Sequence, residues 1–576
     1  MEQTKPVADN TCEMRGKIIR YIYRNGTYSV AVFLDENNRE YIITGDVSAN
    51  PNEKIIISGE WVNHPKYGSQ IQVHYWEYPR PTTKEEAVSL LASGLVKGVG
   101  KKTAERIVAV LGPDAVDRII AEGPEVLNSV KGLGIKKELI YRSLNETLTI
   151  QKVIKKLLPL GFTPKTAYKI FKKFGPSAAD KVMLNPYCLT EIEGIGFHKA
   201  DHIAQRILNI APDSRYRIEA AIQFILEEAA WNNGHCYLPE GELNRTVKDL
   251  LKCGTVDSDK IKEAVESLVV QKKVHISDEG IHLASIFNAE DAIASKIAEL
   301  VQNNKPLNKT EVLKTVARYE ASTGLRLSSL QKEAVVKFLS GEGILVLTGG
   351  PGTGKSFTVK SLLAVIKQVN PEWQIALAAP TGKAAKRMEE LTGAKAKTIH
   401  RLLAFTPGGK PQYNRDNPLS YDVIIVDETS MLNVFLARQL LDAVKPGARV
   451  MFIGDTDQLP AIGPGNVLGD MIEAGISCVR LNKIFRQAEE SQIIVGAHTV
   501  NNGKVYYPNH DKGDFYWLRN PANTLSLLKR CIERLLELGY TFDDVMVITP
   551  VKRGPLGTTA LNKYLQELFN PGERRG

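Results

Sequence analysis

The spacing of apolar residues changes several times along the chain and divides it into segments with different expected folds. Residues 11–80 alternate apolar and polar positions, as in "KIIRYIYRNGTYSVAVFLDENNREYIITG", with turn sequences between the runs. Successive side chains of a strand point to opposite faces, so a period of two is typical of short antiparallel strands. We therefore predict a small β-barrel in residues 1–82.

Aromatic residues are frequent in this predicted barrel: Tyr21, Tyr23, Tyr28, Phe33, Tyr41, Trp61, Tyr67, Tyr75 and Trp76. In an oligonucleotide-binding (OB) barrel such rings stack on unpaired bases. Barrel cores and protein interfaces use the same residue types, so base stacking and ordinary packing both remain possible roles for these rings.

A helical period follows "YPRPTT", and residues 83–210 contain an internal repeat. The segment "GVGKKTAERIVAVLGPDAVD" from Gly98 recurs as "GFTPKTAYKIFKKFGPSAAD" from Gly161, 63 residues later. "LNSVKGLGIKK" likewise recurs as "LTEIEGIGFHK". We predict a duplicated unit with two helical hairpins in each copy.

The recurring apolar-x-Gly-apolar-Gly segment before a helix resembles the helix-hairpin-helix motif of DNA repair and recombination proteins. Its glycines allow a tight turn, and the N–H groups at the start of the next helix face a phosphate, so it reads the DNA backbone. Three of the four hairpins keep both glycines: Gly98 and Gly100, Gly132 and Gly134, Gly194 and Gly196. We predict DNA contact for these three, with mere helix packing as the alternative.

The fourth hairpin, at Gly161, has Thr163 in place of the second glycine and Pro164 after it, so we interpret it as structural. The four hairpins share a basic segment: residues 83–210 hold 20 Lys and Arg against 13 Asp and Glu, in a chain of net charge +9. A polyanion is therefore expected to bind here first.

Residues 211–320 are predicted to form helices followed by a β-hairpin, "KKVHISDEGIHLA", an order that resembles a winged helix. The many acidic residues of its helices favour a bridging role over DNA contact.

From Gly343 the pattern becomes strand, glycine-rich turn and helix. Residues 349–356 match G-x-x-x-x-G-K-[ST] in full, between the strand "GILVLTGG" and the helix "TVKSLLAVIKQV". In this context loop amides cradle phosphates, Lys355 neutralises their charge and the Ser356 hydroxyl binds Mg²⁺. We predict a site for ATP and Mg²⁺ formed by Gly350, Gly352, Thr353, Gly354, Lys355 and Ser356.

The later strand "DVIIVDETSM" ends in two acids. Asp427 is suited to hold Mg²⁺ and Glu428 to polarise the attacking water. The alternative is a pair of surface acids at the end of a strand, which fits poorly because the preceding strand residues are so apolar.

Six motifs in order, "GGPGTGKS", "APTGKAAKRM", "TIHRLL", "VDETSML", "GDTDQLPAIGPG" and "LNKIFRQ", resemble the superfamily 1 helicases of the 5′→3′ branch, the RecD-like DNA helicases. With the barrel and hairpins, the chain is similar to their long, stand-alone type. The resemblance implies a multidomain α/β and α protein with a RecA-like P-loop lobe at 321–480 and a second RecA-like lobe at 481–576.

The resemblance also implies residue roles. Gln331 reads the adenine edge, Gln458 and Arg486 contact the γ-phosphate, and Thr381, Lys383 and His400 grip single-stranded DNA. The insertion at 404–420, with Gly408-Gly409 at its centre, stands where the family has a β-hairpin pin that splits the duplex; an ordinary loop is the alternative.

The second lobe is expected to be incomplete. "DDVMVITP" is predicted to be a strand, and the following residues look like the family's fourth motif region, but its fifth and sixth motifs do not follow before Gly576. A longer chain or a second polypeptide is expected to supply them, with a distinct short product as the third alternative.

Composition narrows the function classes. The apolar and charged fractions, 43% and 24%, are those of an ordinary globular protein, and no basic head with an apolar run predicts export, so a bacterial cytosol or nucleoid location is expected. Six scattered cysteines suggest neither disulfides nor zinc, and His198 and His202 stand one helical turn apart without further ligands.

The sequence thus predicts an ATP-dependent, Mg²⁺-using DNA helicase with 5′→3′ polarity, acting in repair or recombination. Its expected partners are single-stranded and forked DNA and other repair proteins, with no membrane. The alternative is a truncated nucleotide- and DNA-binding module without motor activity.

Overall fold

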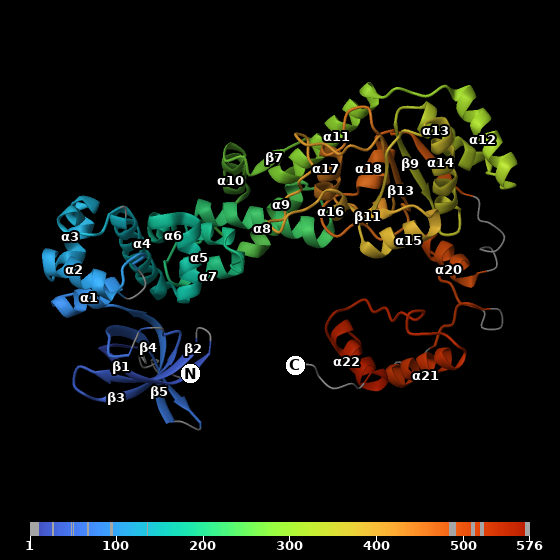
Figure 1. Ribbon diagram of the computed structural model, residues 1–576. Coiled ribbons are helices and arrows are strands. Elements are labelled where there is room, and N and C mark those ends of the chain that lie inside the picture. Colours follow the sequence, from blue (N-terminus) through green and yellow to red (C-terminus); the bar gives the residue numbers. More distant parts are fainter. Residues whose placement is uncertain are drawn as a thin grey trace. The chain divides into compact units, whose positions relative to one another are not determined.

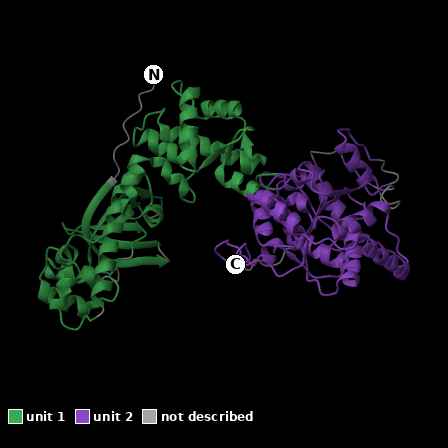
Figure 2. Cartoon of the chain, turned by 90° about the horizontal axis from the view of Figure 1, so that it is seen from above, with its two compact units in different colours: residues 1–291, 462–465 green, residues 292–461, 466–576 purple. Residues whose placement is uncertain are grey.

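The computed structural model describes residues 11–25, 28–47, 49, 51–65, 68–92, 96–134, 136–482, 491–508, 513–518 and 523–570. The chain divides into two compact units (Figure 2): residues 1–291 with 462–465, and residues 292–461 with 466–576. The division falls inside helix α11 (Ala284–Asn303). The domain boundaries at 82, 210, 320 and 480 stay predictions.

The first unit begins with the predicted barrel, which is confirmed (Figure 1). Its strands are β1 (Thr11–Asn25), β2 (Tyr28–Asp35), β3 (Glu40–Gly45), β4 (Lys54–His64) and β5 (Gly68–Glu77), closed in the order β1-β2-β3-β5-β4. Only the β3–β5 pair is parallel. Apolar positions of the alternating pattern, such as Ile18, Phe33 and Ile57, point inward and are fully buried.

The aromatic residues of the barrel separate into three groups. Phe33 and Tyr75 are buried and belong to packed interiors, whereas Tyr23, Tyr28 and Trp61 are exposed. Tyr67 lies outside the described residues. Tyr21, Tyr41 and Trp76 are partly buried against the barrel core. Base stacking stays a prediction for the exposed and partly buried rings.

The hairpin segment is helical throughout. Its elements are α1 (Lys84–Ala92), α2 (Lys101–Leu111), α3 (Ala115–Glu122), η1 (Pro124–Ser129), α4 (Lys136–Leu157), η2 (Leu158–Leu160), α5 (Pro164–Phe174), η3 (Gly175–Ser177), α6 (Ala178–Leu184), η4 (Pro186–Glu191) and α7 (Phe197–Arg206). The run from α2 to α4 and the run from α5 to α7 have matching helical elements, as the repeat predicts. The two copies contribute to separate apolar cores.

The next segment contains α8 (Arg215–Asn233), β6 (Tyr237–Leu238), α9 (Glu240–Leu251), α10 (Ser258–Val270), β7 (Val274–Ile276) and β8 (Ile281–Leu283), with a sheet in the order β6-β8-β7. A largely buried bidentate ion pair joins α8 to α7: Arg217 Nε and Nη2 donate to Asp201 Oδ1 and Oδ2 at 2.8 and 3.0 Å. The second copy of the hairpin unit and this segment share one apolar core, so these two are packed together.

The second unit is built on a parallel sheet in the order β11-β10-β12-β13-β9-β14. The strands are β9 (Ile344–Gly349), β10 (Ile375–Ala379), β11 (Ala396–Thr398), β12 (Val423–Val426), β13 (Arg449–Gly454) and β14 (Cys478–Leu481). The helices are α12 (Lys309–Thr323), α13 (Ser329–Ser340), α14 (Lys355–Val369), α15 (Gly382–Thr392), α16 (Ile399–Leu402), α17 (Val434–Asp442) and α18 (Val467–Glu473), with η5 at Thr429–Met431. Every residue of β9, β12 and β13 is buried, which explains their unbroken apolar runs.

Two expectations in the second unit are corrected. The insertion at 404–420 contains no strand; a turn closed by Thr406 N–H to Lys410 O at 2.9 Å stands where a β-hairpin was predicted. Residues 543–550 are not a strand either, and Met546 and Ile548 are exposed. No strand among the described residues pairs with their backbone, and a short apolar run alone does not make a sheet.

The remaining described helices are α20 (Gln492–Asn501), α21 (Thr524–Glu537) and α22 (Thr558–Phe569). Within the described part of the chain, no helix combines the length and apolarity that crossing a membrane requires.

Candidate ATP-binding site

The phosphate-binding loop connects β9 to α14. Gly352 and Gly354 adopt left-handed φ values of 76° and 86°, which favour glycine. Gly354 is the N-cap of α14 and makes no side-chain cap, so the first amides of the helix are left for a ligand. Thr353 Oγ1 donates to Gly350 O at 2.8 Å and holds the loop closed.

The Lys355 ammonium folds back over this loop. Its Nζ donates to Gly349 O and, at 3.1 Å, to Gly350 O. Burial lowers the pKa of Lys355, while the carboxylates of Asp455 and Asp427 oppose that shift. A partly buried cation at the mouth of an amide-lined loop is suited to neutralise phosphate charge.

The two predicted acids follow β12, two strands from β9 in the sheet. Burial raises the pKa of Asp427, and burial together with the Asp427 carboxylate raises the pKa of Glu428. Glu428 is held in the left-handed region at φ 53°, with its N–H donating to Asp427 Oδ1 at 2.9 Å. Backbone strain at a non-glycine residue is a feature of functional sites.

Burial disfavours the ionised forms of Asp427 and Glu428, and a bound cation would offset that cost, so the pair fits a cation site. Oxygen donors are those that Mg²⁺ prefers, and Mg²⁺ is usually bound through one or two carboxylates plus phosphates and water rather than by an all-protein cage. Consistently, no cluster of three or more His, Cys, Asp or Glu arranged for a metal occurs among the described residues. Asp427 and the Ser356 hydroxyl remain the predicted ligands.

The structure adds two residues that the sequence analysis missed. Asp455, buried at the carboxyl end of β13, and Arg387, on α15, both act electrostatically on Lys355. Arg387 also acts on Asp427 and Glu428. The signal for Asp455 was available, because the carboxyl ends of adjacent parallel strands meet at one edge of a sheet. Arg387 lies in mid-helix and had no such signal.

Gln331 is buried on α13, and the oxygen of its side-chain amide already accepts a hydrogen bond within the chain. Its Oε1 accepts from Ser328 N at 2.9 Å in a capping box, in which Ser328 Oγ accepts in turn from Gln331 N at 3.3 Å. Its Nε2 is buried without a hydrogen-bond partner among the described residues. An unpaired buried donor costs about 1–3 kcal/mol, so the NH₂ group is poised for an acceptor such as a purine ring nitrogen.

The predicted γ-phosphate contacts are only partly described. Gln458 is exposed in the loop after β13, and its N–H donates to Asp455 O at 3.3 Å. Arg486 lies outside the described residues.

The predicted DNA-gripping residues follow β10 and β11. Thr381 is the N-cap of α15, and its Oγ1 accepts from Ala384 N at 3.3 Å. Lys383 Nζ lies 3.7 Å from Met546 Sδ, and the His400 ring packs against Phe405 with centroids 4.8 Å apart. The Thr381 hydroxyl thus has a structural role, and DNA contact stays a prediction for all three.

The hairpin glycines separate into turn and cap positions. Gly98, Gly132, Gly134 and Gly194 have positive φ values of 82°, 83°, 49° and 90°. Gly100 and Gly196 are extended N-caps of α2 and α7 that make no side-chain cap. In the fourth hairpin, Thr163 Oγ1 instead accepts from Thr166 N at 3.3 Å, so a first-turn amide of α5 is already occupied.

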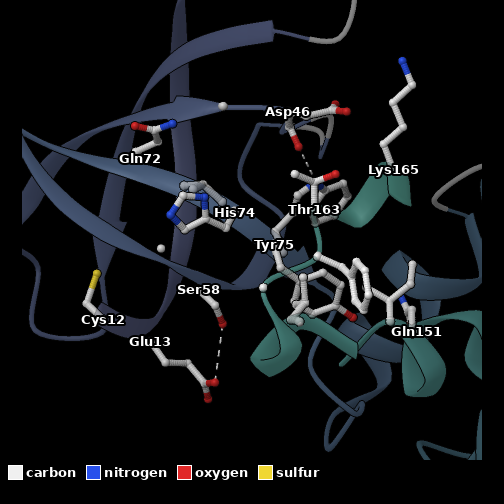
Figure 3. A pocket seen from close by; sticks show the side chains of 18 of the residues that line it. Cys12, Glu13, Asp46, Ser58, Gln72, His74, Tyr75, Gln151, Thr163 and Lys165 are labelled. Carbon is white, nitrogen blue, oxygen red and sulfur yellow. Dashed lines mark hydrogen bonds between the residues drawn. The ribbon is translucent and has the colours of Figure 1, made fainter. Parts of the chain in front are cut away.

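A cavity of about 1160 Å³ lies between the barrel and this fourth hairpin (Figure 3). Glu13 and His74 line it from the barrel, and Thr163 and Lys165 line it from the hairpin. Its lining includes two carboxylates, those of Glu13 and Asp46, against one lysine. Because grooves for a nucleic acid backbone carry an excess of positive charge, this lining does not favour DNA.

A parallel sheet with a phosphate-binding loop and acids at neighbouring strand ends defines the second unit as a P-loop nucleotide-binding lobe. Family models agree: residues 331–464 match an AAA domain, and residues 89–139 match a SAM-like helix-hairpin-helix tandem. Residues 11–81 match the OB-fold domain of the ATP-dependent DNA helicase YrrC, and residues 146–237 match the helix-hairpin-helix domain of the ATP-dependent RecD2 DNA helicase.

Similar proteins narrow the assignment from a P-loop protein to one helicase family. The ATP-dependent RecD2 DNA helicase of Deinococcus radiodurans is 34% identical over 531 residues, which are 88% of this chain and 71% of the relative. The chain belongs to this RecD2 helicase family. The RecBCD enzyme subunit RecD of Mycobacterium tuberculosis is 32% identical over 296 residues, 47% of this chain and 50% of that one. The crystal structure of Pif1 helicase from Candida albicans, 24% identical over 42% of this chain and 62% of its own, aligns with a TM-score of only 0.27.

Proposed function

We propose that the protein is an ATP-dependent DNA helicase that moves 5′→3′ along single-stranded DNA and unwinds duplex ahead of it, in repair or recombination. The observation that carries this proposal is the convergence of Lys355, Asp427 and Glu428 on the carboxyl edge of one buried parallel sheet. Membership of the RecD2 helicase family supports it.

Each residue of the site has a role in hydrolysis under this proposal. The loop amides and Lys355 bind and neutralise the phosphates, and Gln331 Nε2 donates to the adenine ring. Ser356 and Asp427 would hold Mg²⁺, which supplies charge neutralisation at the phosphates. Glu428 accepts the proton of the attacking water, while Gln458 and Arg486 contact the γ-phosphate.

The DNA-binding part of the proposal has two components. Thr381, Lys383 and His400 grip the translocating strand. The three intact hairpins hold the phosphate backbone through their helix N-termini. Open space above Gly100, Gly134, Gly194 and Gly196, where an added Cβ would meet no atom within 4 Å, supports access for a phosphate.

The proposal also covers architecture. Residues 211–320 form a winged-helix-like linker domain, supported by the order helix, strand, helix, helix, hairpin within residues 215–283. Residues 481–576 are part of a second RecA-like lobe, supported by the resemblance of "LNKIFRQ" to a helicase motif.

ATP hydrolysis with and without single-stranded DNA tests the motor, with Lys355→Ala as the inactive variant. Lys360→Ala is the matched control, because Lys360 is exposed on the same helix. We expect DNA to stimulate hydrolysis in the wild-type chain and in Lys360→Ala, and Lys355→Ala to lose about 100-fold or more. Unwinding of a 5′-tailed duplex, but not of a 3′-tailed one, is expected.

Two outcomes would contradict the proposal in different ways. Normal turnover by Lys355→Ala would refute the phosphate-binding loop as the site of hydrolysis. Binding of ATP and DNA without stimulated hydrolysis would favour the alternative function, a nucleotide- and DNA-binding module.

A further inference from the structure

We propose that His498 is an additional ligand of the ATP terminal phosphate, an inference that rests on the proposed ATPase function. His498 lies on α20, outside the sheet that carries the other site residues. Its Nε2 is buried and has no hydrogen-bond partner among the described residues. A buried ring nitrogen without a partner is costly, which indicates that a polar group absent from the chain itself completes the contact.

The His498 ring lies directly against the phosphate-binding loop. A Cβ placed on Gly350 would be 3.2 Å from Cε1 of the ring and 3.7 Å from Nε2. A side chain at this position would be in tight contact with the ring, which would have to shift by a few tenths of an ångström. The glycine at position 350 therefore lets the imidazole reach the loop backbone.

The position along the loop points to the terminal phosphate. Gly350 O accepts from Lys355 Nζ at 3.1 Å, so His498 packs at the part of the loop over which the lysine ammonium lies. In phosphate-binding loops that lysine reaches the β- and γ-phosphates. A ring N–H there adds a donor to the same anionic group, and hydrogen bonds to charged groups are the strong ones.

Helix α20 is held so that His498 faces the loop. Its start is capped by Asp514, whose carboxylate accepts from Ser491 Oγ at 2.5 Å and from Gln492 N at 2.8 Å. Gly496 packs against the Tyr506 ring on one side of the helix. His498 is two residues further, about 200° around the helix, and so lies on the opposite side.

This contact would connect nucleotide state to a segment beyond the sheet. The loop, Asp427 and Asp455 all belong to the sheet that ends with β14, whereas α20 follows it in the chain. A phosphate bound by both His498 and the loop ties α20 to the site. Loss of the terminal phosphate removes that tie.

The test measures binding of a non-hydrolysable ATP analogue and of ADP to the full chain without DNA. His498→Phe keeps a flat ring against Gly350 but has no N–H, whereas His498→Gln keeps a donor near the place of Nε2. Val500→Ala is the matched control, since Val500 is exposed on the same helix. We expect His498→Phe to bind the ATP analogue about ten-fold more weakly while its ADP affinity changes less than about two-fold. His498→Gln should recover most of the loss, and Val500→Ala should match the wild-type chain.

Three results would overturn the inference. The first is unchanged binding of the ATP analogue by His498→Phe. The second is an equal loss of analogue and ADP binding by His498→Phe, which would mean that the ring only shapes the loop. The third is a loss of analogue binding in His498→Gln as large as in His498→Phe. With wild-type binding intact, each leaves the proposed ATPase function standing. Failure of the wild-type chain to bind either nucleotide would overturn both.

Discussion

The P-loop and the intact hairpins differ in how each is proposed to bind a phosphate. The P-loop lies at the edge of a buried sheet, where Lys355, Asp427 and Asp455 bring charge to it. The hairpins are surface turns whose glycines leave helix amides open, as at Gly100 and Gly196. In the proposed function, the first arrangement transfers a phosphoryl group because charged side chains are fixed around it, whereas the second supplies amides to a DNA backbone.

The largest expected effect is on the chemistry of the first region. Glu428→Gln removes the proposed base but keeps the shape of the side chain, so hydrolysis should fall about 100-fold or more while ATP affinity is retained. Steady-state hydrolysis and equilibrium nucleotide binding measure the two quantities. Glu390→Gln, on the exposed face of α15, is the control. Equal loss of binding and hydrolysis would argue that Glu428 is a structural residue.

A second, smaller effect concerns how the site selects the nucleobase of the bound nucleotide. Gln331→Ala removes the unpaired Nε2 donor, and we expect about ten-fold weaker ATP binding and a reduced preference for ATP over GTP. The same change also breaks the capping box. Ser328→Ala breaks only the box, at a cost of about 1 kcal/mol in the free energy of unfolding, and should leave base preference unchanged. A shift of base preference in Ser328→Ala would assign the effect to the helix start instead.

These residues also show what the sequence could predict. The P-loop and the acidic pair are contiguous motifs, so their residue types and their strand context are visible together. Asp455, Arg387 and His498 come from separate segments, and only folding brings them to the loop.

The two corrected elements fail for a related reason. Residues 543–550 contain a short apolar run, Val545 to Ile548, which is typical of a buried strand, but such a run specifies no pairing partner. The Gly408-Gly409 turn forms, with Gly409 at φ 73°, yet its flanking residues do not pair as strands. Local patterns thus predict local geometry, and pairing depends on what lies beside the segment.

A third prediction tests the grip of the hairpins. Gly100→Asp and Gly196→Asp add good N-caps at extended positions with open space around them, so both helices should be preserved or stabilised. The new carboxylate occupies the place proposed for a phosphate, and we expect each variant to bind DNA several-fold more weakly, with a smaller salt dependence. Thr163→Asp is the matched control and should leave affinity unchanged. Equal effects at all three positions would mean that general repulsion, and not these amides, accounts for the loss.

The smallest expected effect comes from making the fourth hairpin resemble the others. Thr163→Gly frees the Thr166 N–H that the threonine hydroxyl now occupies, at a cost of only a few tenths of a kcal/mol to α5. If open amides alone make a hairpin bind, DNA affinity should rise by about two-fold or less, measurable by titration at low salt. The adjoining cavity, with Glu13 and Asp46 against Lys165, works against a larger gain. A variant with unchanged affinity would show that an open helix start is not sufficient, and that the surrounding charge decides which hairpins hold DNA.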